Sequence, residues 1–201
     1  MSATKCPECG FGYVPEISSE IERHNAFHDE HVYGPATGLS DGIHFVTPES
    51  PPELRKTAGD AARVARRDTP YDLPLYSAEE QPSDSNPIIA LEVHEGRAIA
   101  IIVTREKDIE YRVSLDDFEP NSMTQSWRPT KGEKVAPHRK RAIEFIWVLQ
   151  RQRGTGVPDR LLRDLQGHIG HPLCEFAHAL PFTEAAVKFW RKRGVNEFYI
   201  A

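Results

Sequence analysis

The chain has 201 residues, of which 39% are hydrophobic and 27% are charged, and its formal net charge at pH 7 is -5. These values suit one globular domain, with or without a small added module, and argue against wholesale disorder. The negative charge gives no overall attraction to a polyanion, and no apolar run reaches membrane-spanning length. The N-terminus MSATKCPECG lacks the hydrophobic region of a signal peptide, so we expect an intracellular protein, cytoplasmic or, in a eukaryote, nuclear.

Two cysteines and two histidines near the N-terminus have the spacing of a zinc site. Cys6 and Cys9 form a CxxC pair, and His24 and His28, one helical turn apart, follow after fourteen intervening residues. Two thiolates and two imidazoles complete a tetrahedral Zn2+ shell and leave no open coordination position. The spacing therefore predicts a C2H2-type zinc finger over residues 1–33 with a structural metal, and His31 is the only rival ligand.

The finger's predicted helix, with Ser19 and Glu22 at capping-box spacing, is not suited to reading DNA. Acidic residues dominate its exposed positions: Glu16, Glu20, Glu22, Asp29 and Glu30. They would repel phosphate, and a single finger contacts only about three base pairs. The sequence therefore argues against direct nucleic-acid binding.

A linker rich in glycine and proline is predicted over residues 34–44, and the main domain over residues 45–201. The domain's first predicted helix has Ser50 as its N-cap, Pro51 as its first residue and Glu53 at capping-box spacing. Its apolar face consists of Leu54, Ala58, Ala61, Ala62 and Ala65.

Three β-branched segments then predict an antiparallel meander over residues 88–94, 98–104 and 109–115, with turns at 95–97 and 105–108. Residues 119–141 are polar and predict a long loop. The remaining predicted elements are a strand over 142–149, a glycine loop over 150–156, a helix over 157–170, a strand over 172–180, a helix over 181–194 and a strand over 196–201.

The glycine loop between strand and helix favours an anion. Arg151, Gly154 and Gly156 form an RxxGxG pattern that opens onto a helix, where backbone N–H groups point toward a ligand such as a phosphate. The pattern lacks the Lys-Ser/Thr ending of a P-loop and the first-strand setting of a dinucleotide-binding fold. A tight turn that uses its glycines for packing alone is the alternative.

The order of these elements and the RxxGxG loop resemble the GNAT superfamily of acetyl-CoA-dependent N-acetyltransferases. The finger, the segments HFVTPESPPELRKTAGDAARVARRD and IEFIWV, and the ending EFAHALPFT…FYI look like the sister-chromatid cohesion (ESCO-type) acetyltransferases. The resemblance covers nearly the whole chain. It implies a mixed α/β (α+β) fold in which helices flank a mostly antiparallel sheet, behind an N-terminal zinc finger.

The resemblance also implies acetyl-CoA as co-substrate. The main chain of Ile146, Trp147 and Val148 would pair with its pantetheine arm between splayed strands, and the glycine loop would hold its pyrophosphate. The other implied cofactor-binding residues are Arg151, Arg153, Gly154, Thr155, Gly156, Val157 and Pro158 in and after the loop, and Phe182, Thr183 and Lys188 on the far side.

Attack of an amine on a thioester needs a neutral nitrogen and a nearby base. Glu144 occupies the position where many GNAT enzymes carry a glutamate base, so it is the first candidate, with Asp164 as the second. A solvated strand residue is the alternative for Glu144. Where the cohesion enzymes carry a serine, a helix acid and an aspartate, this sequence has Glu144, Arg163 beside Asp164, and Leu180.

The leading hypothesis is transfer of an acetyl group to an amine, with a protein lysine as the favoured acceptor and a small amine as the alternative. Asp116, Asp117 and Glu119 would attract a cationic amine. An inactive GNAT-like domain whose finger docks a protein or nucleic acid is a third hypothesis. The sequence leaves the oligomeric state open.

Cys174 and His178 are four residues apart on a predicted strand and therefore on one face. A nucleophilic Cys-His pair is conceivable. A buried cysteine beside a histidine with satisfied hydrogen bonds is the favoured interpretation.

Overall fold

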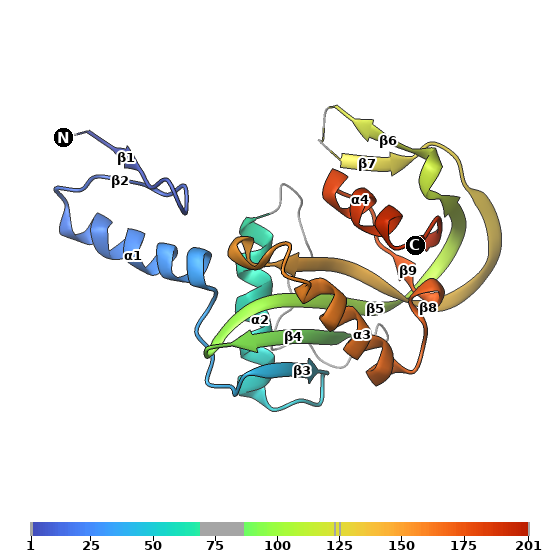
Figure 1. Cartoon of the computed structure of the whole chain (residues 1–201), viewed down its shortest axis with the longest axis horizontal. Coiled ribbons are helices and arrows are strands. Elements are labelled where there is room, and N and C mark those ends of the chain that lie inside the picture. The colour runs from blue at the N-terminus through green and yellow to red at the C-terminus, as the bar shows by residue number, and fades with distance from the viewer. Residues whose placement is uncertain (1, 69–86, 123, 125, 201) are drawn as a thin grey trace. The chain divides into compact units, whose positions relative to one another are not determined.

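The computed structural model describes residues 2–68, 87–122, 124 and 126–200. The chain divides into two compact units, whose elements are labelled in Figure 1. Unit 1 contains Met1–Gln81, Ile89–Ile101 and Ile146–Leu161, and unit 2 contains Pro82–Ile88, Ile102–Phe145 and Leu162–Ala201. Within the described residues, no helix is both long and apolar enough to cross a membrane.

Unit 1 begins with the finger, in which β1 (Thr4–Lys5) pairs antiparallel with β2 (Gly12–Tyr13) and is followed by α1 (Ser18–Tyr33). The predicted capping box of α1 is wrong. Ile17 is the N-cap, and no side chain accepts a hydrogen bond from the first turn. Because the helix already includes Ser18, the hydroxyl of Ser19 lies inside it and cannot cap its start.

Acidic side chains in the second half of α1 hold the finger against the rest of unit 1. Glu30 accepts two hydrogen bonds from Arg63 of α2 (Pro52–Arg67), both 2.9 Å long. Asp29 accepts another from Arg97, at the start of β5 (Arg97–Ser114), at 3.0 Å. Paired hydrogen bonds between an arginine and a carboxylate are among the stronger polar contacts in proteins. Two acidic residues expected on an exposed face therefore form an intramolecular interface.

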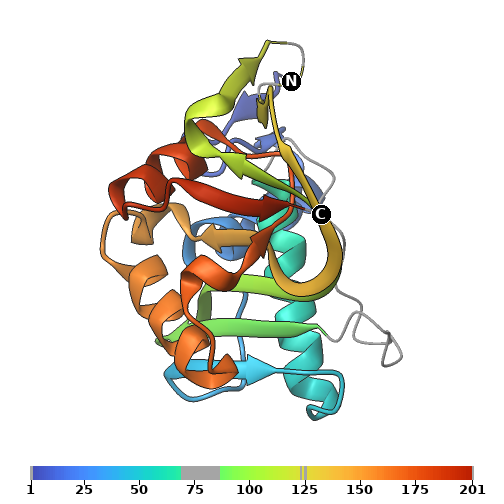
Figure 2. The same ribbon diagram turned by 90° about the vertical axis from the view of Figure 1, so that its right-hand side faces the viewer.

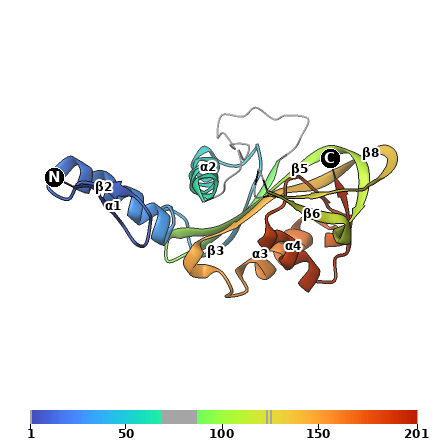
Figure 3. The ribbon, with the colours of Figure 1, turned by 90° about the horizontal axis from the view of Figure 1, so that it is seen from above.

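β3 (Gly42–Val46), β4 (Ile88–His94) and the start of β5 lie side by side in unit 1 (Figure 2), and β3 is antiparallel to β4. Glu95 and Gly96, with φ values of 51° and 68°, make the tight turn from β4 to β5. In Figure 3, α2 and the first turn of α3 (Val157–Ile169) lie on opposite faces of these strands. β3 begins inside the predicted linker of residues 34–44, and the predicted domain boundaries stay a prediction.

α2 confirms the predicted alanine face but starts one residue later than predicted. Pro51 is its N-cap. The Ser50 hydroxyl instead accepts a hydrogen bond from the Thr47 N–H at 2.9 Å, in the turn before the helix. The residues that α2 buries are Ala58, Ala61, Ala62, Val64 and Ala65.

In unit 2, four strands close on themselves. β10 (Glu197–Ile200) pairs antiparallel with the end of β5 and parallel with β9 (Ala177–His178), and β9 pairs parallel with β8 (Glu133–Val148). The strand order β10-β9-β8-β5-β4-β3 makes β8 the neighbour of β5. A separate hairpin of β6 (Phe118–Asn121) and β7 (Ser126–Pro129) and the helix α4 (Glu184–Lys192) complete the unit. The mixed sheet with flanking helices confirms the predicted fold class.

Two predicted interruptions of the β-structure are wrong. The predicted turn at 105–108 lies inside β5, which is 18 residues long, and the predicted loop over 119–141 contains most of β6, all of β7 and the first half of β8. Asp108 is the one residue of the segment REKD that favours a turn, and the segment contains neither glycine nor proline. Its alternate side chains form ion pairs with β8, in which Arg105 and Lys107 contact Glu144. Charged strands were therefore mistaken for loops.

The predicted strand over 172–180 is wrong for most of its length. Leu173–Glu175 is a 3-10 helix, and only Ala177–His178 is strand. Cys174 is exposed, so its interpretation as a buried residue is wrong, and the two side chains do not share a strand face. His178 is 3% exposed, and its ring lies 4.7 Å from that of Trp190.

The burial of His178 should make the fold sensitive to acid. Burial lowers the pKa of His178 from 6.5 to about 3. Below pH 6.5 the unfolded chain therefore binds a proton that the folded chain does not, and stability is lost as the pH falls toward 3. In His178→Leu, we expect the loss of unfolding free energy between pH 7 and pH 5 to be about 2 kcal/mol smaller, as measured by urea denaturation. An identical loss in both proteins would contradict this assignment.

Candidate functional site

The four predicted zinc ligands come together in unit 1. Cys6 and Cys9 lie in the turn between β1 and β2, and His24 and His28 lie on successive turns of α1. One donor atom from each residue lies within 4.8 Å of the others. The turn is closed by a hydrogen bond from the Gly10 N–H to the Cys6 carbonyl, at 2.9 Å.

The donor atoms suit a bound cation. Hydrogen bonds from the backbone of Cys9 and from His24 lower the pKa of the Cys6 thiol to about 6, which favours the thiolate at neutral pH. Burial raises the pKa of Cys9, and a metal ion would favour its ionised form. His24 Nε2 is buried and has no hydrogen-bond partner among the residues that the structure describes, and coordination would satisfy it. A Cys2His2 set fits tetrahedral Zn2+ in a structural role.

His31, the rival ligand, lies outside this cluster. Its Nε2 is 3.2 Å from a carboxylate oxygen of Asp68, the residue that ends α2. Asp68 also accepts a hydrogen bond from Trp147 Nε1 at 2.8 Å. The sequence reasoning missed Asp68, because a single aspartate after a helix has no periodic or motif signal and its partners are far away in the sequence.

β8 has one open side beside the glycine loop. β9 pairs with β8 only at Ala142 and Ile143. In the part of the chain that the structure describes, the β8 backbone from Glu144 to Val148 therefore has no strand partner on that side. An open strand side offers N–H and C=O groups to an extended ligand. This stretch contains Ile146, Trp147 and Val148, the predicted partners of the pantetheine arm.

The loop after β8 presents its backbone. Gly154 and Gly156 have φ values of 82° and 83°, a conformation that favours glycine. A Cβ atom on either residue would meet no atom of the described residues within 4 Å, so they leave this loop surface open. In the first turn of α3, Pro158 has no N–H, and the N–H groups of Asp159 and Arg160 donate to the Gly156 carbonyl at 3.1 and 3.2 Å. The loop backbone before the helix is therefore the part that an anion would meet.

The two loop arginines hold the loop in place. The Arg153 Nε–H donates to the Val148 carbonyl at 3.1 Å, across the turn. The Arg151 guanidinium lies over the ring of Tyr33 of α1, 5.1 Å from its centroid. Both contacts lie within unit 1. Each of them holds the side chain of a predicted cofactor-binding arginine in contact with another part of the protein.

The other predicted loop residues shape the start of α3. The Thr155 hydroxyl donates to the Gln152 carbonyl at 2.7 Å, which closes the turn. Val157 is buried and anchors the helix. Pro158 is the second helical residue, where its missing N–H costs nothing. These roles leave the backbone as the part of the loop that a ligand would meet.

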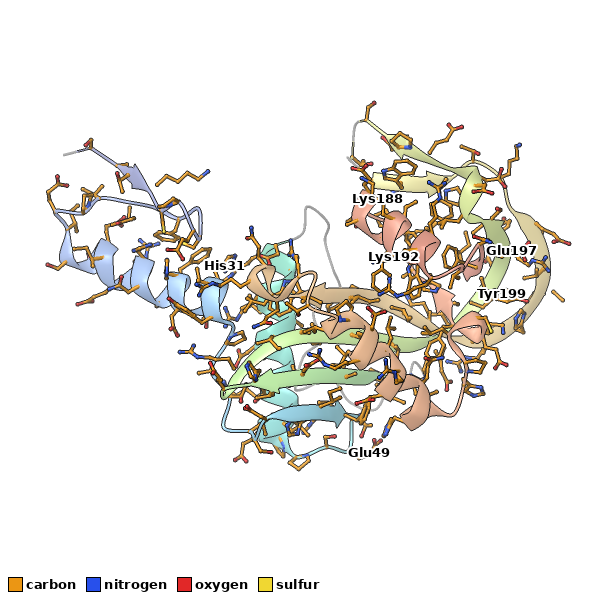
Figure 4. All side chains as sticks on the ribbon, viewed as in Figure 1. His31, Glu49, Lys188, Lys192, Glu197 and Tyr199 are labelled. Atoms are coloured by element: carbon orange, nitrogen blue, oxygen red, sulfur yellow. The ribbon has the colours of Figure 1, made fainter. Side chains whose placement is uncertain are left out.

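Three predicted cofactor residues lie in unit 2. Phe182 packs against the ring of Phe118, with centroids 5.1 Å apart. Thr183 caps α4 and accepts a hydrogen bond from the Ala186 N–H at 3.0 Å. Lys188 lies on α4 with an exposed side chain (Figure 4). Their role in cofactor binding stays a prediction.

Glu144 lies in the unit 2 part of β8. Its side chain is 4% exposed, and its oxygens lie 3.1 Å from Arg105 Nε and 2.8 Å from Lys107 Nζ. The alternative interpretation as a solvated strand residue is therefore wrong. Asp164, the second candidate base, is exposed on α3.

The metal site can be tested with a ligand and a non-ligand from the finger. We expect the wild-type protein to retain one zinc ion per chain after gel filtration, and Cys9→Ser to lose it, because three ligands bind zinc far more weakly than four. His31→Gln, on the same helix, should retain its zinc. Elemental analysis by mass spectrometry measures the metal. Retained zinc in Cys9→Ser, or lost zinc in His31→Gln, would refute the ligand set.

No family model matches the chain. Two relatives are both named N-acetyltransferase ECO1. The protein from Eremothecium gossypii is 28% identical over 193 residues, which cover 79% of this chain and 70% of that protein. The protein from Candida glabrata is 22% identical over 182 residues, with the same coverage of each chain.

Among solved structures, the xEco2 acetyltransferase domain bound to a CoA conjugate matches with a TM-score of 0.58 and 21% identity, covering 82% of this chain and 94% of that one. Another structure of the same domain has the same TM-score and 19% identity, covering 82% and 93%. These matches show that the chain has the fold of that domain. The ECO1 relatives and the Cys2His2 cluster support the resemblance of the chain to the sister-chromatid cohesion (ESCO-type) acetyltransferases.

Proposed function

We propose that the protein is an acetyl-CoA-dependent N-acetyltransferase that acetylates a lysine side chain of a protein. The observation that carries this proposal is the open side of β8 beside the glycine loop. Two further findings support it: both relatives are named N-acetyltransferase, and the xEco2 acetyltransferase domain was solved with a CoA conjugate.

The proposed cofactor site depends mainly on backbone. The amide groups of the pantetheine arm suit the N–H and C=O groups that residues 146–148 turn toward the open side of β8, in the manner of an added strand, while the Val148 carbonyl accepts from Arg153. The pyrophosphate suits the loop backbone at Gly154 and Gly156, directly before α3. Because backbone supplies these contacts, cofactor binding should tolerate Arg163 and Leu180, where the sequence departs from the cohesion enzymes.

Glu144 is the proposed general base in a direct attack of the amine on the thioester. Its two carboxylate oxygens lie 3.1 Å from Arg105 Nε and 2.8 Å from Lys107 Nζ. Each oxygen of Glu144 is thus already in an ion pair with a cation. We therefore place a water between Glu144 and the attacking nitrogen, which would carry the proton to the carboxylate.

The proposed acceptor is cationic before it reacts. Asp116, whose side chain is 88% exposed, and Glu119 on β6 are acidic groups of unit 2 that would attract a lysine ammonium. A small amine would meet the same charges, because a fold does not determine the acceptor. The identity of the acetylated product distinguishes the two.

Cofactor binding is tested with Gly156→Ala. An L-residue is strained at a φ of 83°, so the loop should shift, and we expect acetyl-CoA affinity measured by titration calorimetry to fall about tenfold. The matched control is Gly167→Ala. This glycine lies inside α3, where an added Cβ meets nothing within 4 Å, so affinity should stay unchanged. If the wild-type protein does not bind acetyl-CoA, the proposed function is wrong.

Acceptor and base are tested together. The protein is incubated with labelled acetyl-CoA and a panel of lysate proteins, peptides and small amines, and mass spectrometry identifies the products. We expect acetylated protein lysines, and Glu144→Gln should lower kcat about 100-fold while acetyl-CoA affinity changes less than about twofold.

The matched control for this substitution is Asp164→Asn, which removes the exposed second candidate and should leave kcat within about twofold. A large loss in Asp164→Asn with none in Glu144→Gln would transfer the base assignment to Asp164. Acetylated small amines with unmodified proteins would overturn the proposed lysine acceptor.

A further inference from the structure

Three segments of unit 1 meet at the carboxylate of Asp68. His31 of α1 contacts Oδ1 at 3.2 Å. Trp147 of β8 donates its indole N–H to Oδ2 at 2.8 Å, and Arg153 of the glycine loop lies 3.6 Å from the same oxygen. Figure 4 labels His31 near the C-terminal end of α1. One side chain therefore connects the finger helix with both parts of the proposed cofactor site.

Asp68 is held in its charged form. Its side chain is 18% exposed, and burial alone would favour the neutral acid. Hydrogen bonds from His31 and Trp147, together with the charge of Arg153, outweigh this burial and keep the pKa of Asp68 below its usual value. A carboxylate has lone pairs enough to accept from all three partners at once.

The partners on the cofactor side control the backbone that would meet acetyl-CoA. Trp147 is 3% exposed, and its N–H would be buried without an acceptor if Asp68 were absent. Trp147 is the middle residue of the open stretch 146–148 of β8. Arg153 reaches from Asp68 to the Val148 carbonyl and precedes Gly154, so it sets where the loop leaves the strand.

The partner on the finger side depends on the zinc-binding helix. His31 follows the proposed zinc ligand His28 by three residues, and its ring stacks on Phe27 with centroids 4.2 Å apart. Phe27 packs on Phe11, which lies between the zinc cysteines and β2. A zinc ion that orders this half of α1 would therefore also fix the ring that contacts Asp68.

We propose that Asp68 is a positioning residue for acetyl-CoA binding, and that the zinc finger supports cofactor binding through the contact between His31 and Asp68. This inference rests on the proposed function. In the zinc-free protein, a loosened α1 would withdraw one of the three partners of Asp68. The strand and the loop would then hold their binding geometry for a smaller fraction of the time, and the apparent affinity for the cofactor would fall in proportion to that fraction.

The test is titration calorimetry of acetyl-CoA into the full-length, zinc-loaded protein, a measurement that needs no acceptor. Asp68→Asn keeps the shape but lacks the charge and cannot accept from all three donors, so affinity should fall about tenfold. His31→Phe keeps the ring stacking but cannot donate, and affinity should fall about threefold. His31→Gln has an amide donor and should restore affinity to within about twofold of wild type. If Asp68→Asn does not fold, the difference in acetyl-CoA affinity between His31→Phe and His31→Gln tests the proposal by itself.

A structural control separates positioning from general loosening. Glu30→Gln weakens the ion pairs of α1 with Arg63 and Arg67, on the same helix interface. It should lower the melting temperature while leaving acetyl-CoA affinity within about twofold of wild type. If it weakens binding as much as His31→Phe at equal loss of melting temperature, the proposed route through Asp68 is wrong.

Removal of zinc from the wild-type protein and from Asp68→Asn gives a thermodynamic cycle that tests whether the two changes act through the same contacts. In the wild-type protein, stripping the metal with a chelator should weaken acetyl-CoA binding about threefold, and in Asp68→Asn it should add less than about 1.5-fold, because the connection is already broken. Independent, multiplying effects would overturn the link to zinc. Binding by wild type with unchanged affinity in Asp68→Asn and His31→Phe overturns this inference and leaves the proposed function intact. Failure of the wild type to bind overturns both.

Discussion

The candidate site depends on one feature of the sheet, the early end of the pairing between β8 and β9. Among the described residues, the ladder covers Ala142 and Ile143, and the Ala179 N–H donates to the Ile143 carbonyl at its end. Two residues later comes Pro181, which has no N–H and cannot extend a ladder. Beyond Ile143, no described residue pairs with β8 on that side as a strand, although β5 neighbours it on the other, and the side chains of Trp147 and Val148 are buried. Backbone groups in such a place need water or a ligand as partner.

This feature determines how much the chemistry of the site depends on sequence. Main-chain groups and a glycine turn tolerate wide change in the side chains around them, which is consistent with a preserved fold at about one-fifth identity to the xEco2 domain. Acid-base chemistry has no such tolerance, because it needs a particular group at a particular distance. The ion pairs of Glu144 with Arg105 and Lys107 surround the proposed general base. Acid-base chemistry is also where this sequence departs most from the cohesion enzymes.

The features that were predictable are those encoded over short distances. The zinc spacing, the bounds of β4 and the helix after the glycine loop follow from residues within one or two turns or a single strand. The prediction was wrong where polar residues have distant partners. Arg105 and Lys107 read as a turn because Glu144, which pairs with them, is nearly forty residues away. Asp68 was missed for the same reason, since all three of its partners lie outside α2.

The contacts of α1 also change what the finger's charge means. A negative helix argues against binding phosphate, but Asp29 and Glu30 are matched to Arg97 and Arg63 in the same unit. Forming these pairs removes charge from solvent at both partners, which is favourable only where the geometry is good and repeated. Two such pairs and the His31 contact lie along barely one turn of helix. That density of specific contacts is what a fixed support requires, whereas a finger that searches for an external ligand would keep this surface open.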